Sequence, residues 1–178
     1  MNARADHSTD PLAVYLRDHY AGSAAGLALV QRCREANQGT ALEEVLAGIE
    51  AEISEDRRSL AEIMDRLQVT PSAFKAALGR GSELIGRLKS NGTIVRRSPS
   101  STVVELEGLA AGILTKASLW RSLRAAAAHR QGLDVAELDR LLDRANDQLE
   151  RVRAAHDQAA GRAFASSHRS IAAGEGGG

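Results

Sequence analysis

Apolar residues recur along four long segments of the chain with alternating steps of four and three residues, which places one stripe of side chains along each predicted helix. Such a stripe is typical of a helix that packs lengthwise against other helices. Each stripe also holds one ionisable residue among its apolar neighbours, in chain order His19, Asp56, Lys116 and His156. A bundle that buries the four stripes together must therefore accommodate these polar side chains.

Alanine, leucine, arginine and glutamate dominate the chain and aromatic residues make up only 3%, so the composition favours helices over strands. Asp10, Thr102 and Asp134 each place a capping oxygen before a first turn, and Gly39 and Gly132 mark helix ends. The predicted fold is all-α, with four long antiparallel helices in two hairpins and one shorter connecting helix. We expect helices at 11–37, 41–68, 71–89, 103–130 and 135–164.

The periodic part of the 178-residue chain forms one expected domain, a helical bundle at 10–165. The segments 1–9 and 166–178 lack periodic apolar positions. We therefore expect a flexible N-terminus and a disordered tail rich in glycine and serine.

Charge and cysteine content narrow the classes of partner. Lysine plus arginine total 23 and aspartate plus glutamate total 23, so no net charge attracts nucleic acid or an acidic membrane, and neither partner is expected. Cys33 is the only cysteine, which excludes an internal disulfide and a thiolate zinc site. No apolar run suggests a signal peptide or a membrane span, so the expected location is the cytoplasm.

Short predicted loops near Gly39 and Gly132 imply two antiparallel hairpins. Measured along the axis from these turns, Asp56 and Lys116 lie at about 26 and 24 Å, and His19 at about 30 Å. If both turns lie at one end, these three residues and Gln148 form a buried polar layer. Glu107 and His156 then form a second one, about two turns away. If the segment 69–102 instead crosses the full length of the bundle, the second hairpin points the other way. We then expect the polar residues of the two hairpins to lie at different heights.

Two interpretations fit the polar residues. In the first, they satisfy one another and set helix register, and Asp56 is buried beside Lys116 or His19. In the second, imidazoles and carboxylates form a divergent site for iron, manganese or zinc. Lys116 at the same height would repel a cation, so we expect no stoichiometric metal. The candidate metal ligands are His19, Glu52, Asp56, Glu107 and His156.

The stretches "LRDHYAGSAAG", "EISEDRRSLAEIM" and "LTKASLWRSL" resemble an uncharacterised bacterial helical-bundle family with a ferritin-like outline, over most of residues 10–163. The resemblance implies two helical hairpins joined by a long connection. In di-iron ferritin-like proteins, two helices each carry Glu-x-x-His and two others each supply a glutamate. This chain lacks that motif. The residues three positions before His19, His129 and His156 are Leu16, Ala126 and Arg153.

No catalytic signature occurs in the sequence. We therefore expect a non-enzymatic, cofactor-free cytoplasmic bundle that acts through protein–protein interaction or self-association, as a homo-oligomer or with a protein partner. The alternative is a divergent ferritin-like protein that binds metal or acts as a metal-dependent oxidoreductase.

Overall fold

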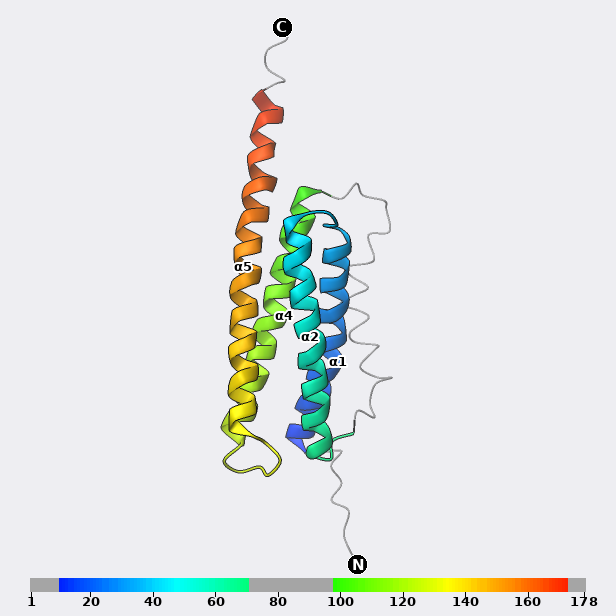
Figure 1. Cartoon of the computed structure of the whole chain (residues 1–178), viewed down its shortest axis with the longest axis vertical. Helices are drawn as coiled ribbons and strands as arrows, with labels where there is room; N and C mark the ends of the chain where they lie inside the picture. The colour runs from blue at the N-terminus through cyan, green and yellow to red at the C-terminus, as the bar shows by residue number, and fades with distance from the viewer. Residues whose placement is uncertain (1–9, 71–97, 173–178) are drawn as a thin grey trace, which may run out of the picture.

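The computed structural model describes residues 10–70 and 98–172, which form four α-helices (Figure 1). Within these residues there is no β-strand, so the predicted all-α fold is confirmed. The expected connecting helix at 71–89 and the chain ends at 1–9 and 173–178 lie outside the described residues. The helices are α1 (Pro11–Glu35), α2 (Ala41–Arg66), α4 (Pro99–Ala126) and α5 (Val135–Ala172).

The two hairpins point in opposite directions. In Figure 1, α1 runs upward and α2 downward, whereas α4 runs downward and α5 upward. Polar contacts agree with this order: Arg66 at the end of α2 donates to the carbonyl of Gly132, and Arg32 near the end of α1 pairs with Glu105 near the start of α4 at 3.1 Å. The turn of the second hairpin therefore lies at the opposite end of the bundle from that of the first.

Local sequence accounts for most helix starts. The Asp10 carboxylate accepts a hydrogen bond from the Leu12 amide at 3.1 Å, and Asp134 accepts one from the Ala136 amide at 2.9 Å. The predicted start of α4 after Thr102 is wrong, because Ser98 caps the helix instead. Its hydroxyl accepts from the Ser100 amide, and proline at the first helical position tolerates the missing N–H.

The last helix is longer than the sequence pattern predicts. α5 continues to Ala172, so the expectation that the whole segment 166–178 is disordered is wrong for 166–172. The segment from 165 to 172 holds no glycine or proline, so no strong helix breaker ends α5 before Ala172. In Figure 1 the upper part of α5 extends beyond the other three helices.

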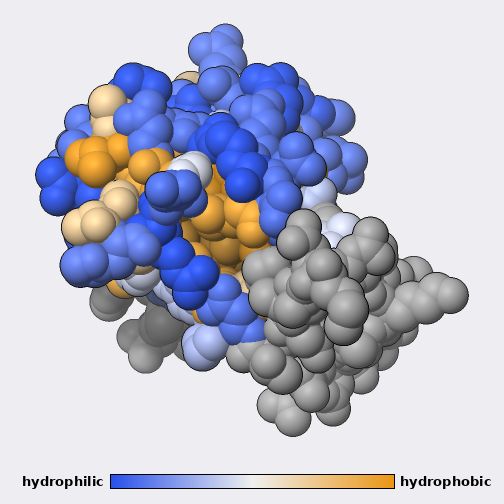
Figure 2. All heavy atoms as spheres, turned by 90° about the horizontal axis from the view of Figure 1, so that it is seen from below, coloured by the Kyte–Doolittle hydropathy of each residue, from blue (hydrophilic) through white to orange (hydrophobic). Residues whose placement is uncertain are grey.

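The buried apolar residues form two clusters stacked along the bundle axis. The lower cluster contains Leu60, Trp120 and Leu138, and the upper one contains Ile49 and Ile113. Figure 2 views the lower end and shows apolar residues in the centre of that face, with hydrophilic residues around them. Between the two clusters lies a layer of polar side chains.

Candidate functional site

The polar layer is centred on Asp56, whose residue surface is only 2% exposed. Its carboxylate forms ion pairs with Lys116 from α4 and with Arg144 from α5, whose Nε lies 2.8 Å from Oδ1. The side chain of Gln148, also buried, donates to Asp56 Oδ2 at 3.3 Å and accepts from the Lys116 ammonium. Every polar group of this layer therefore has a partner on another helix.

The inverted second hairpin does not separate these residues, contrary to the expectation from turn distances. Asp56 lies ten residues before Arg66, the last residue of α2, and Lys116 lies ten residues before Ala126, the last residue of α4. Because α2 and α4 run in the same direction, the two side chains share one height near the middle of the bundle. The turns near Gly39 and Gly132 lie at opposite ends of the bundle, so distances measured from them did not predict that Asp56 and Lys116 share one height.

His19 is not part of the polar layer, so that part of the prediction is wrong. Its ring is half-buried and packs edge-on against Tyr15, with the ring centroids 4.4 Å apart. Burial lowers the pKa of His19, and the nearby Asp18 carboxylate opposes this effect. The core positions of α1 are Ala13, Leu16, Val30 and Cys33. His19 is therefore a packed aromatic contact beside the core and not a partner of Asp56.

Arg144 is the member of the layer that the sequence analysis missed. It lies one turn before Gln148 on α5 and also pairs with Glu55 at 2.9 Å. The available signal was the spacing of four residues between Arg144 and Gln148, which places both on one side of a helix. One turn further along, Glu52 of α2 pairs with Arg151 of α5, which extends the ionic contacts between these helices.

The polar layer is suited to a structural role and not to catalysis. Burial lowers the pKa of Lys116, while the adjacent Asp56 carboxylate opposes this shift. The ammonium is hydrogen-bonded to Asp56 and Gln148, so it is not presented to a substrate. Trp120, one turn after Lys116 on α4, has a buried indole N–H without a partner among the described residues.

The candidate metal ligands do not converge. Asp56 and Glu52 are held by arginine and lysine, and His19 packs on Tyr15. Glu107 and His156 do meet, at 3.3 Å, but on the surface and next to Asp157. Hydrogen bonds that the His156 ring donates to the carboxylates of Asp157 and Glu107 raise the pKa of His156. Within 10–70 and 98–172, no three histidine, cysteine or acidic side chains are grouped as a metal site requires.

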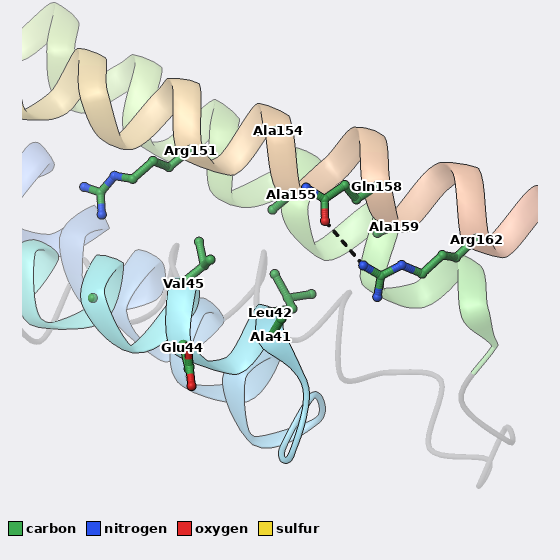
Figure 3. Close-up of a pocket in the computed structure, with 11 residues that line it drawn as sticks. Ala41, Leu42, Glu44, Val45, Arg151, Ala154, Ala155, Gln158, Ala159 and Arg162 are labelled. Atoms are coloured by element: carbon green, nitrogen blue, oxygen red, sulfur yellow. Dashed lines mark hydrogen bonds between the residues drawn. The ribbon is translucent and has the colours of Figure 1, made fainter.

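A groove of about 590 Å³ lies between the first turns of α2 and the second half of α5. Figure 3 shows Leu42 and Val45 pointing from α2 toward α5, while Glu44 points away. On α5, the Arg162 guanidinium donates to Gln158 at 3.3 Å. Alanines line the α5 wall, at positions Ala154, Ala155 and Ala159.

A second surface is distinguished by its lack of charge. Residues 19–31 of α1 include no aspartate, glutamate, lysine or arginine. In residues 108–120 of α4, the only one of these four residue types is Lys116, whose ammonium is turned to Asp56. The two helices are neighbours, since Leu29 of α1 lies 3.3 Å from a Cβ built at Gly108 of α4. We call this surface the α1/α4 face. The exposed residues of these two stretches are Gly22, Ala24, Ala28, Gly108, Ala111, Gly112, Leu114, Thr115 and Ser118.

Comparisons with protein-family models, with curated proteins and with solved structures find no match to this chain. Among the described residues, no helix combines the length and the apolar character needed to cross a membrane.

Proposed function

We propose that this protein is a non-enzymatic cytoplasmic helical bundle that self-associates through the α1/α4 face. The observation that carries the proposal is the absence of charge among the exposed residues of two neighbouring helical stretches, which include Leu114 at 48% exposure. An uncharged surface loses little hydration free energy when it is covered, whereas buried unpaired charges cost much more.

The other two helices offer a contrast that supports this choice of face. The exposed positions of α2 include Glu55, Arg58 and Glu62, and those of α5 include Arg140 and Asp143. Charged side chains are depleted at the centres of protein interfaces. The α1/α4 face is therefore the side of the described bundle that best suits a protein contact.

Sedimentation velocity over a range of protein concentrations tests the proposal. The wild-type chain should form a species larger than the monomer, and Leu114→Glu should shift it toward the monomer, because it places a carboxylate within the uncharged stretch of α4. Val135→Glu is the matched control, since Val135 is 44% exposed but lies at the first turn of α5. A wild-type monomer at about 1 mM, or equal effects of both variants, would refute self-association through this face.

The second candidate is a divergent ferritin-like metal protein. Two observations favour it: α2 ends and α4 begins at opposite ends of the bundle, as in bundles of the ferritin-like type, and Glu107 meets His156. Lys116 and Arg144 form ion pairs with the Asp56 carboxylate, which weighs against a metal at that position. Elemental analysis decides between the two. About one equivalent of iron, manganese or zinc, lost in His156→Ala, would support the metal protein.

A further inference from the structure

One side of α1 is apolar although it is turned away from α2 and α4, the described helices that α1 contacts. Arg57 of α2 donates to the Tyr20 carbonyl, and Leu29 lies beside Gly108 of α4, so these contacts mark the two flanks of α1. The remaining side, opposite the buried residues, carries Ala21, Ala25 and Ala28. The outward side of a surface helix is normally polar, so this alanine stripe is suited to contact with another segment.

The chain after α2 leads to this side of α1. Thr70, which follows α2, accepts a hydrogen bond on its carbonyl from Arg17 of α1 at 3.0 Å. Near the start of α4, Glu105 pairs with Arg32 of α1 at 3.1 Å. The connection 71–97 therefore begins and ends beside α1, at opposite ends of the uncharged run that lies between Arg17 and Arg32.

Length and direction of the connection match this part of α1. As the helix that the sequence predicts, residues 71–89 would be roughly 28 Å long, and α1 spans roughly 27 Å from Arg17 to Glu35. In Figure 1, α2 ends at the same end of the bundle at which α1 begins, so a helix that follows α2 and leads to α4 would run parallel to α1. Its apolar residues follow one stripe, at Phe74, Leu78, Ile85 and Leu88.

We propose that residues 71–89 dock as a helix along the outer side of α1, parallel to it and on the alanine stripe. The hydrogen bond between Arg17 and Thr70 keeps the start of the segment near the level of Arg17. From there, two parallel helices rise equally per residue, so the register of the contact follows from the sequence.

In this register the two stripes match. Phe74 lies four residues after position 70 and Ala21 lies four residues after position 17, so the two are level. Leu78 and Ala25 are level for the same reason, four residues further on. Large side chains of the segment thus meet small residues of α1, which allows the two helices to approach closely.

Docking of 71–89 and the proposed self-association are independent of each other. Leu114 lies seven residues after Glu107, which contacts His156 of α5, so Leu114 lies on the side of α4 that is turned toward α5. A segment on the outer side of α1 leaves Leu114 uncovered. The α4 stretch of the α1/α4 face is then the part that remains for a second copy.

Cysteine cross-linking of the full chain tests the contact. In a Cys33→Ala background with oxidised glutathione, Ala25→Cys with Leu78→Cys should form a disulfide within one chain, because facing residues of two packed helices come within disulfide distance. Ala51→Cys with Leu78→Cys is the matched control and should react at least tenfold more slowly. Ala51 is exposed on α2 and, like Ala25, lies ten residues from the end of its helix at the α1–α2 turn.

Two outcomes of this experiment would contradict the docking. Equal rates for the two pairs would show that residue 78 has no preferred place beside α1. Disulfides formed mainly between two chains, seen as a doubled mass on a non-reducing gel, would assign this side of α1 to a second copy instead.

Trypsin cleavage after Arg80 gives a second readout. Ala25→Glu should speed this cleavage at least fivefold, because a carboxylate inside the apolar contact weakens docking, whereas Ala51→Glu should leave the rate unchanged. Leu114→Glu should not alter cleavage either, so a failure of the proposed self-association can be told apart from a failure of this contact. Unchanged cleavage in Ala25→Glu would overturn the docking of 71–89 on α1.

Discussion

Asp56 of α2 and Lys116 of α4 form an ion pair across the diagonal of the bundle, between two helices that are not neighbours. The pair is possible because α2 and α4 run in the same direction and each residue lies ten positions before the end of its helix. Arg144 and Gln148 complete the layer from α5. Such a layer favours one register of α2, α4 and α5, because a shift of any of these three helices would leave a buried charge without its partner.

Asp56→Ala should lower the free energy of unfolding by about 3 to 5 kcal/mol, because it leaves a mostly buried ammonium without a counter-charge. Denaturant unfolding followed by circular dichroism measures the loss. Glu62→Ala on the same helix is the control. Glu62 is exposed and its pairing with Arg58 is long, so its removal should cost less than about 1 kcal/mol. Equal losses for the two variants would contradict the central role of Asp56.

Replacing both Asp56 and Lys116 should lower the free energy of unfolding less than replacing Asp56 alone. In Asp56→Leu with Lys116→Met, no buried ammonium is left unpaired, and Arg144 keeps its contact with Glu55 at 2.9 Å. We expect the double variant to recover at least about 1 kcal/mol relative to Asp56→Leu alone, since apolar substitutes for buried ion pairs are often tolerated. A double-mutant cycle measures this coupling, and strictly additive losses would argue against direct pairing.

His19 should make the protein less stable as the pH falls. Its pKa in the folded state is lowered by burial, so the unfolded chain binds the proton more tightly. The free energy of unfolding should therefore decrease once the pH falls below the unfolded pKa of about 6.5. His19→Gln should lose less stability between pH 7 and pH 5 than the wild type does. A steeper loss in the variant would contradict the direction of this shift.

His156 should act in the opposite direction. Its pKa is raised in the folded state, first by the hydrogen bond with Asp157, so its contribution is present below the unfolded pKa and is lost as the pH rises through the folded pKa. His156→Gln should therefore lose stability relative to wild type at pH 5 and much less at pH 8. The effect should stay below about 1 kcal/mol, because the pair with Glu107 lies at the surface.

The sequence predicted the four described helices and three of the four members of the polar layer, because seam periodicity marks which side chains face inward. His19 was misplaced because its position in the repeat was taken as buried, whereas α1 has no buried residue between Leu16 and Val30. Arg144 was missed because a long arginine side chain reaches Asp56 from outside the apolar stripe. The direction of the second hairpin depends on tertiary packing, which periodicity alone does not specify.

Gly132 and Gly161 should respond in opposite ways to the same substitution. Gly132 has a φ of +92°, and a Cβ there would lie 3.4 Å from Leu67 and 3.5 Å from the Arg66 carbonyl oxygen, so Gly132→Ala should cost about 1 to 2 kcal/mol. Gly161 lies within α5, where a Cβ would meet no atom within 4 Å. Gly161→Ala should therefore stabilise the helix by up to about 1 kcal/mol. Thermal unfolding of both variants measures the difference, and a stabilised Gly132→Ala would contradict the left-handed turn between α4 and α5.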